Sequence, residues 1–207
     1  NLLDIDVKEA ALGFGDDEWA PPYSFPDLTN CERIAIDLET RDPNLTTLGP
    51  GWCRDDGYVI GYAVAAGDFV GYYPVRHEAG NLPEKSVVNW LKKQMATPNI
   101  EKVMHNAMYD LGWMRWAGIE VQGPIIDTMI AAPILNENRR YYNLNSLTGE
   151  YLGEYKNEKM LKAAAAMYHV DPKSGMWRLP SKFVGSYAEQ DAAVTLRLWD
   201  RLRPEII

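Results

Sequence analysis

The sequence predicts an α/β domain in which a central mixed β-sheet is flanked by helices. Apolar runs of strand length fill the first half of the chain, and longer segments typical of helices fill the second half. The sequence contains no internal repeat and no low-complexity tract. With 207 residues, the chain is long enough for one well-buried domain and short for two.

The first 32 residues are predicted to form a lead-in segment without much regular structure. They are acidic, and Pro21, Pro22 and Pro26 disfavour helices and central strands. We therefore expect residues 1–32 to pack on the edge of a domain that spans residues 33–207.

The predicted sheet begins at the apolar, partly β-branched run 34–36, which has the character of a buried strand and ends near Thr40. A loop rich in Pro, Gly and Asn follows at 41–57. Two alternating runs separated by Gly67 predict a hairpin. The further strands are expected at 58–66, 68–73 and 101–104.

Helices are predicted from apolar periodicity and from residues that start or stop a helix. Pro83 suits a first helical turn, and Gly118 is typical of the position after a helix end. The predicted helices span 82–95, 105–118, 125–135, 144–151, 154–168 and 183–202.

The formal net charge of -8 argues at first against a nucleic-acid partner, because such proteins usually present a basic surface. Two interpretations remain open: the acidic residues keep the domain soluble, or some of them bind cations that in turn meet phosphate. Cys31 and Cys53 have no metal-ligand spacing and are expected to be reduced thiols. The sequence has no long apolar run and no signal-peptide pattern, so we expect a cytoplasmic protein without a membrane partner.

Two acids close the first predicted strand. Asp37 and Glu39 are two residues apart, so both side chains project from one face of the strand while Leu38 points to the other. Two like charges on a buried strand repel each other unless a cation lies between them. The alternative is that the strand has already ended and both acids are solvated, which is the commoner situation for an isolated pair of this kind.

Two predicted helices carry further candidates. Asp110 lies among large apolar side chains, although an aspartate on a helix surface would give the same pattern. Asn106 is a candidate N-cap of that helix. Tyr187 and Asp191 are four residues apart on the last helix and therefore share one face.

Together, in this order, these residues resemble the DEDDy branch of the DnaQ-like 3′→5′ exonucleases. The closest resemblance is to the proofreading domain of family A polymerases, which are DNA polymerase I-like and include phage enzymes. The family motifs D-x-E-T, N-x-x-[YF]-D and Y-x-x-x-D match Asp37-Glu39-Thr40, Asn106-Tyr109-Asp110 and Tyr187-Asp191. Between the second and third motifs, Asp127-Thr128 and the run 143–147 match patterns of the same family, and the resemblance covers residues 33–203.

The resemblance implies a ribonuclease-H-like fold and a metal-dependent phosphodiester hydrolase that uses two divalent cations, Mg²⁺ with Mn²⁺ as a substitute. Asp37 would bridge both ions, and Glu39 and Asp191 would complete the ion that binds the attacking water. Asp110 would hold the second ion, largely through water. Tyr187 would orient the attacking water, because a phenol with a pKa near 10 is a poor base at neutral pH.

The implied substrate is the 3′ end of single-stranded or frayed DNA, from which nucleoside monophosphates are removed. Thr40, His105 and Asn106 are the candidate nucleic-acid contacts. The implied partner is a DNA polymerase domain or subunit, fused or separate, in a bacterial or phage-infected cell. Residues 139–142 either supply charge and stacking for a frayed strand or form a solvated loop at a helix end. Because no basic surface is evident, we expect the isolated domain to bind DNA weakly.

Two alternatives stay open. An RNA-trimming exonuclease of the RNase D type would share the same four carboxylates and the tyrosine. The polymerase-like patterns at 127–128 and 143–147, and the absence of a helical RNA-binding extension, favour DNA. The second alternative is an inactive scaffold module of a polymerase, which the presence of all four carboxylates disfavours.

Overall fold

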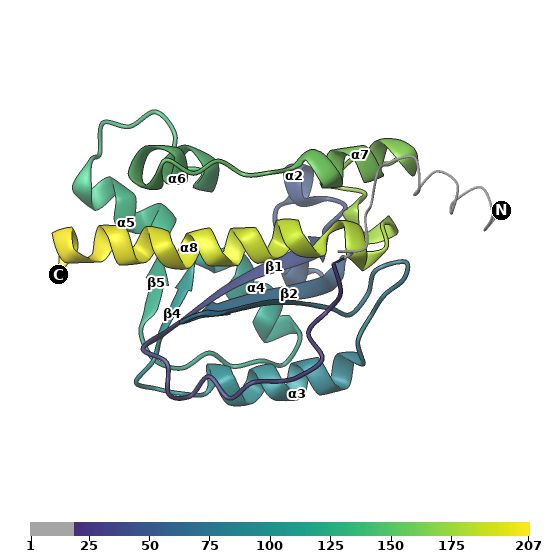
Figure 1. Ribbon diagram of the computed structural model, residues 1–207, viewed down its shortest axis with the longest axis horizontal. Helices are drawn as coiled ribbons and strands as arrows, with labels where there is room; N and C mark the ends of the chain where they lie inside the picture. Colours follow the sequence, from purple (N-terminus) through teal and green to yellow (C-terminus); the bar gives the residue numbers. More distant parts are fainter. Residues whose placement is uncertain (1–18) are drawn as a thin grey trace.

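A five-stranded mixed sheet forms the centre of the molecule, with the strand order β3-β2-β1-β4-β5 (Figure 1). The computed structural model describes residues 19–207. The central strand β1 pairs antiparallel with β2 and parallel with β4, and β5 lies parallel to β4 at the edge. The mixed α/β architecture is therefore confirmed. The strands are β1 (Arg33–Arg41), β2 (Tyr58–Ala66), β3 (Phe69–Pro74), β4 (Glu101–Met104) and β5 (Ile125–Asp127).

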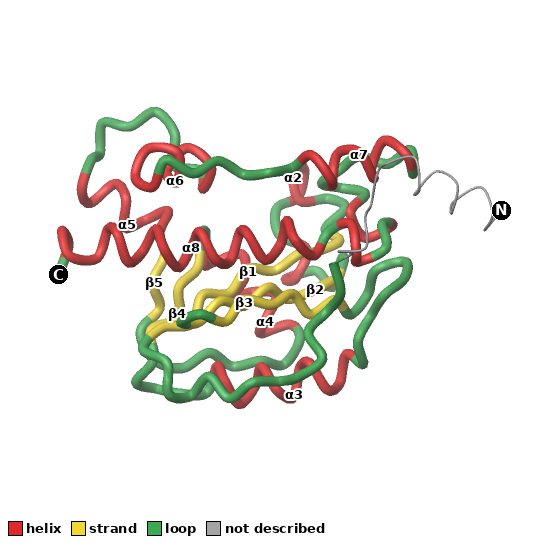
Figure 2. The backbone as a smooth tube through the Cα atoms, in the orientation of Figure 1, coloured by secondary structure: helices red, strands yellow, loops and turns green. Residues whose placement is uncertain are grey.

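Helices cover both faces of this sheet (Figure 2). The long helix α8 crosses one face, with α5, α6 and α7 on its side of the molecule, and α3 lies beneath the opposite face (Figure 1). The helices are α2 (Leu45–Leu48), α3 (Glu84–Met95), α4 (Ala107–Trp116), α5 (Thr128–Leu135), α6 (Leu144–Leu152), α7 (Lys159–Met167) and α8 (Gly185–Ile206), with short 3₁₀ turns η1 (Gly51–Cys53), η2 (Met176–Arg178) and η3 (Ser181–Phe183).

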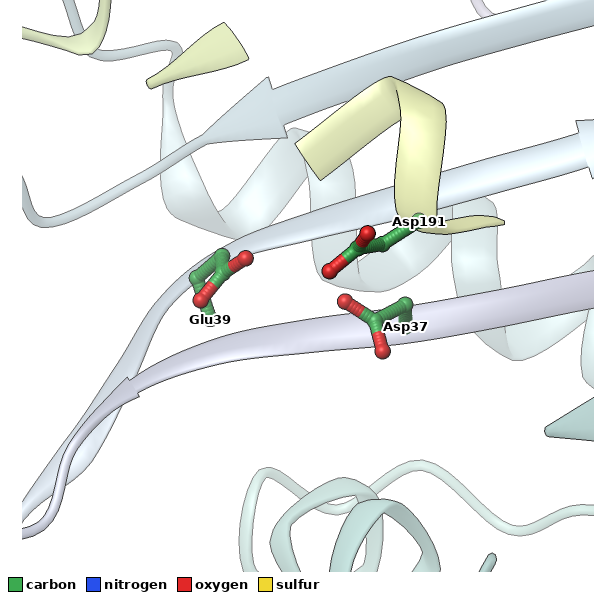
Figure 3. Close-up of side chains that lie close together, drawn as sticks. All are labelled: Asp37, Glu39 and Asp191. Atoms are coloured by element: carbon green, nitrogen blue, oxygen red, sulfur yellow. The ribbon is translucent and has the colours of Figure 1, made fainter. Parts of the chain in front are cut away.

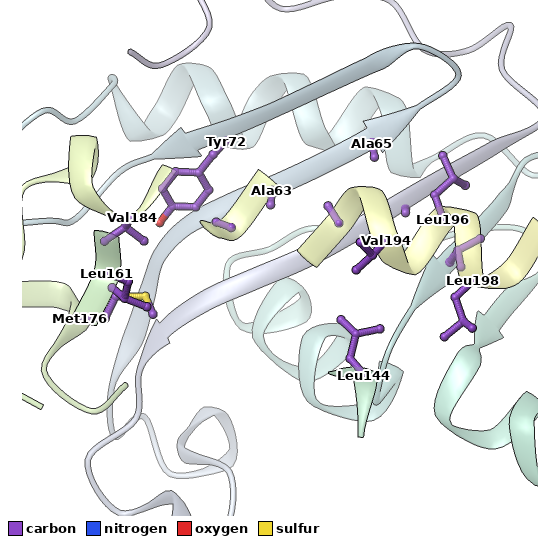
Figure 4. Packing of buried hydrophobic residues seen from close by; sticks show 14 of the residues in the cluster. Ala63, Ala65, Tyr72, Leu144, Leu161, Met176, Val184, Val194, Leu196 and Leu198 are labelled. Carbon is purple, nitrogen blue, oxygen red and sulfur yellow. The ribbon is translucent and has the colours of Figure 1, made fainter. Parts of the chain in front are cut away.

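The sheet separates two apolar cores, and β1 contributes to both by alternation. Ile34, Ile36 and Leu38 are buried against α3 and α4. Ala35 lies in the core beneath α8, together with alanines of β2 such as Ala63 (Figure 4). Small side chains on this face allow α8 to pack close to the strands. The same alternation directs the odd-numbered acids of β1 toward α8.

The predicted helix at 125–135 is wrong in its first turn. Ile125–Asp127 is the edge strand β5, and the helix begins at Thr128. A short apolar run does not distinguish a strand from a helix by periodicity, and pairing with β4 decides in favour of the strand. Asp127 ends the strand and caps the helix, since its side chain accepts a hydrogen bond from the Met129 N–H.

The predicted helix at 154–168 is also too long. Helix α7 begins only at Lys159, and the segment before it is not helical. Tertiary hydrogen bonds take the backbone N–H groups there: Lys156 donates to the Asn145 side chain, and Asn157 donates to the Gln190 side chain. This non-helical segment contains Lys156, whose side chain reaches Asp191 of α8.

Of the lead-in segment, residues 19–32 can be described, and residues 1–18 lie outside the described part of the chain. Phe25 stacks on Tyr73 of β3 and contacts Trp90 of α3, with ring centroids 5.6 and 5.7 Å apart. Leu28 is buried, and its N–H donates to the Gln94 side chain. Within residues 19–207, no helix is both long enough and apolar enough to cross a bilayer.

Candidate metal centre and active site

Three carboxylates from two distant segments converge between β1 and α8. Asp37 and Glu39 project from β1, and Asp191 projects from α8 toward them (Figure 3). One oxygen of each carboxylate lies within 4.8 Å of the others. The alternation of β1 puts the first two acids on the α8 face, and the packing of α8 across the sheet brings the third.

Burial makes the ionised forms of these acids unfavourable. Burial, and next the charge of Asp191, raise the pKa of Asp37 to about 7. Burial raises the pKa of Glu39 well above its usual range, and the charges of Asp37 and Asp191 raise it further. Without a cation, the cluster therefore tends to keep protons at neutral pH.

One cation of the protein itself lies at this cluster. Lys156 Nζ is 2.6 Å from Asp191 Oδ2, and it lies 5.4 Å from the centroid of the Tyr187 ring. Burial raises the pKa of Asp191, and Lys156 counteracts that rise. Sequence reasoning missed this residue, because Lys156 was predicted to lie in a helix and no motif singled it out.

Asp110 lies beside the cluster without belonging to it. It is buried on α4, and its Oδ1 accepts a hydrogen bond from the backbone N–H of Leu38 at 3.2 Å. Burial, and next the charge of Asp37, raise the pKa of Asp110 well above its usual range. The structure thus brings three of the four predicted acids together and places the fourth against the backbone of β1.

Tyr187 lies one helical turn before Asp191, and its hydroxyl, like Lys156, counteracts the rise in the pKa of Asp191. Burial, and next the charge of Glu39, raise the pKa of the Tyr187 phenol far above its usual range. The phenol therefore stays protonated and can act as a hydrogen-bond donor beside the carboxylates.

The predicted nucleic-acid contacts lie at the start of α4 and at the end of β1. The Thr40 hydroxyl is 2.7 Å from the Tyr109 hydroxyl, which donates to Asp42. His105 Nδ1 is 2.8 Å from the Thr128 hydroxyl, while its Nε2 is buried without a partner. Burial lowers the pKa of His105 to about 4, so this imidazole is neutral at pH 7.

Asn106 occupies the N-cap position of α4, but the interpretation of its side chain as the cap is wrong. Its φ of 69° is left-handed, and its side chain makes no cap hydrogen bond. The Asp127 carboxylate accepts from the backbone N–H groups of Asn106 and Ala107 instead, at 2.9 and 2.8 Å. Asp127 thus caps two helices at once, which gives a structural reason for an aspartate at this position.

The carboxylate cluster fits a divalent cation with a preference for hard oxygen ligands. The three acids supply only oxygen ligands, and Asp191 Oδ1 is buried without a hydrogen-bond partner. Such an atom is costly unless a ligand meets it. A cavity of about 820 Å³ lies elsewhere, between α4, α5 and the end of α8. It is lined mainly by apolar side chains and by none of the three clustered acids.

Comparison with known proteins shows the family of this chain. Residues 17–207 match the family model of a 3′-5′ exonuclease domain of DNA polymerase I-like proteins. The chain belongs to this exonuclease domain family. A DNA-directed DNA polymerase of Pseudomonas phage M6 is 38% identical over 196 residues, which are 91% of this chain and 30% of the relative. DNA polymerase I of Chloroflexus aurantiacus is 30% identical over 221 residues, which cover 96% of this chain and 22% of the relative.

The exonuclease domain thus spans less than a third of the length of these polymerase relatives. Solved structures share its ribonuclease-H-like fold, which confirms that prediction. NrnC of Brucella melitensis with bound Mg²⁺ has a TM-score of 0.60 at 18% identity and covers 86% of this chain and 75% of its own. RNase D of Escherichia coli, an exoribonuclease, has a TM-score of 0.59 at 19% identity and covers 86% of this chain and 40% of its own.

Proposed function

We propose that this domain removes nucleoside monophosphates from the 3′ ends of single-stranded or frayed DNA by two-metal-ion hydrolysis, as the proofreading activity of a DNA polymerase. The observation that carries this proposal is the cluster of three carboxylates beside Tyr187, with one buried carboxylate oxygen free of partners. The polymerase relatives support DNA as the substrate and a polymerase domain or subunit, fused or separate, as the partner. The place of action would be the cytoplasm of a bacterial or phage-infected cell.

Asp37, Glu39 and Asp191 would hold the cations, Mg²⁺ in the cell and Mn²⁺ as a substitute, and Asp110 would act through water. When bound, the metal ions lower the pKa of the attacking water and stabilise the leaving 3′ oxygen. The raised pKa of the Tyr187 phenol keeps it protonated, so it does not act as a base. It would instead donate a hydrogen bond that orients the water. Thr40, His105 and Asn106 remain the proposed contacts to the terminal nucleotide.

A 5′-labelled single-stranded DNA oligonucleotide tests the proposal. With Mg²⁺ or Mn²⁺ we expect a ladder of products shortened by single nucleotides, and with EDTA no products. A domain that shows no metal-dependent product and no heat of binding in a titration with Mn²⁺ would instead be an inactive scaffold module.

Replacing Tyr187 with phenylalanine should lower kcat about tenfold to a hundredfold, because one hydrogen bond to a charged or polarised group is lost. The KM for DNA and the thermal stability should stay close to those of the wild-type protein, since the ring remains. Steady-state kinetics with single-stranded DNA measure both constants. Complete loss of activity in Y187F would show that the phenol does more than orient water.

RNA is the second candidate substrate, because RNase D of Escherichia coli, an exoribonuclease, shares this fold at a TM-score of 0.59 and 19% identity. That likeness concerns the fold alone. Matched DNA and RNA oligonucleotides of one sequence separate the two candidates: we expect the larger kcat/KM on DNA, and a larger value on RNA would reverse the assignment.

A further inference from the structure

An arginine lies between two aromatic rings just past the carboxylates. Arg41 is the last residue of β1, two positions after Glu39, and it pairs in register with Tyr58 of β2. Its guanidinium carbon lies 5.6 Å from the centroid of the Tyr58 ring and 5.2 Å from that of Trp177 in η2. All three side chains are half-buried. The rings therefore hold a planar cation in one orientation while part of it stays open to water.

The hydrogen-bond donors of Arg41 are not used inside the protein. Within residues 19–207, its guanidinium makes no hydrogen bond and no ion pair. Arg76 provides the contrast: it also lies over the Tyr58 ring, at 5.3 Å, but its Nε donates to Glu84 Oε2 at 3.0 Å. The donors of Arg41 are available to a ligand.

The position of Arg41 suits a ligand that also reaches the carboxylates. Arg41 and Glu39 are two residues apart on a strand, so their Cα atoms lie roughly 6–7 Å from each other. A polar cavity of about 350 Å³ near the acids is lined in part by Lys156, Lys173 and Glu158. Since Lys156 also contacts Asp191, the cavity adjoins the carboxylate cluster. Basic groups thus lie around the site, although the net charge of the chain, -8, would by itself repel DNA.

We infer that Arg41, held by Tyr58 and Trp177, forms a binding site for a phosphodiester group of the substrate strand, namely the phosphate next to the one that is cleaved. This inference rests on the proposed function. Guanidinium binds phosphate through two parallel hydrogen bonds, and a fork fixed between rings loses little freedom on binding. Such a contact positions the strand and carries no sequence preference. Arg41 is the binding residue, and the two aromatic side chains are positioning residues.

Two substrates separate this role from catalysis. A single-stranded oligonucleotide contains the neighbouring phosphate, whereas the p-nitrophenyl ester of thymidine 5′-monophosphate contains only the one that is cleaved. R41A should raise the KM for the oligonucleotide about tenfold, with kcat nearly unchanged, and should leave hydrolysis of the ester as it is in the wild type. R41K keeps the charge but loses the planar fork. Its KM for the oligonucleotide should lie between those of the wild type and R41A. R76A is the matched control and should behave as wild type.

Binding measured without hydrolysis keeps the test independent of the proposed function. Fluorescence anisotropy with labelled single-stranded DNA in EDTA at low salt should show weaker binding by R41A, and also by R41Q, which avoids an apolar replacement. The slope of log affinity against log salt should fall by roughly 0.7, the value of one lost phosphate contact. A wild-type slope in R41A, or equal losses on the oligonucleotide and the ester, would overturn the assignment. If the slope differs between the wild type and R41A but the wild type hydrolyses neither substrate, only the proposed function would be contradicted.

Discussion

Replacing Asp37 with asparagine should abolish hydrolysis while making the metal-free protein more stable. The catalytic loss should be at least about 10³-fold, because an acid that holds the metal contributes several kcal/mol to the stabilisation of the transition state, and 1.36 kcal/mol corresponds to a factor of ten. Thermal unfolding in EDTA, followed by the nuclease assay with Mn²⁺, measures both effects in one preparation.

The gain in stability follows from the sign of the pKa shift. In the folded protein the pKa of Asp37 is raised to about 7, whereas in the unfolded chain it is about 3.9. Between these two values the folded state binds more protons, so the stability of the metal-free protein falls as pH rises from about 4 through about 7. D37N removes this contribution, and at pH 8 its Tm should exceed that of the wild type by a few degrees.

Asp68 in the exposed turn between β2 and β3 supplies the control, since D68N should change neither activity nor Tm. Added Mn²⁺ should raise the Tm of the wild type much more than that of D37N. If D37N were as active as the wild type, or if its metal-free form were less stable at pH 8, the acids of β1 would not form a cation site.

Replacing Lys156 with methionine should destabilise the metal-free protein and strengthen its affinity for metal. The side chains of Lys156 and Asp191 are 18% and 6% exposed, so the variant leaves a nearly buried carboxylate without its cation. Losing one partner of a fully buried pair costs about 3–5 kcal/mol. The cost here should be smaller, about 1–3 kcal/mol, because the lysine is partly solvated and Asp191 can take up a proton.

Metal should reverse this loss, because a divalent cation held by the Asp191 carboxylate would replace the positive charge that Lys156 places at its Oδ2. The dissociation constant for Mn²⁺, measured by calorimetry, should therefore be lower in K156M than in the wild type, and saturating Mn²⁺ should close the gap in Tm. K162M is the matched control: Lys162 is exposed and pairs with Glu158 one helical turn away, an interaction of about 0.3–0.5 kcal/mol. Weaker Mn²⁺ binding by K156M would show that the lysine builds the site and does not compete with the metal.

Local periodicity explains why several features of the site could be predicted. The two-residue period of β1 sends Asp37 and Glu39 to one face and Leu38 to the other, as the cores on the two sides of the sheet show. The helical period likewise places Tyr187 and Asp191 together on α8. Each of these relations links residues two or four positions apart, so a single segment of sequence is enough to determine it.

Other features depend on which segments meet. The apolar run 125–127 becomes a strand because it pairs with β4. Residues 154–158 stay non-helical because the side chains of Asn145 and Gln190 accept hydrogen bonds from the backbone there. Both segments carry local patterns that suit a helix, and the tertiary hydrogen bonds override those patterns. The prediction of helices at these places failed for this reason.

By itself, the sequence determined the order of strands β1 to β4 and of helices α3 to α8, the carboxylate and tyrosine motifs, and the face of its own element on which each motif residue lies. Only the tertiary structure decided that Asp191 meets the acids of β1, that Asp110 is held against the Leu38 backbone, that Lys156 lies at the carboxylate cluster and that Arg41 lies between two rings. The physical reason is that short-range order follows from backbone geometry, whereas contacts between distant segments follow from the packing of α8, η2 and the loop before α7 on the sheet.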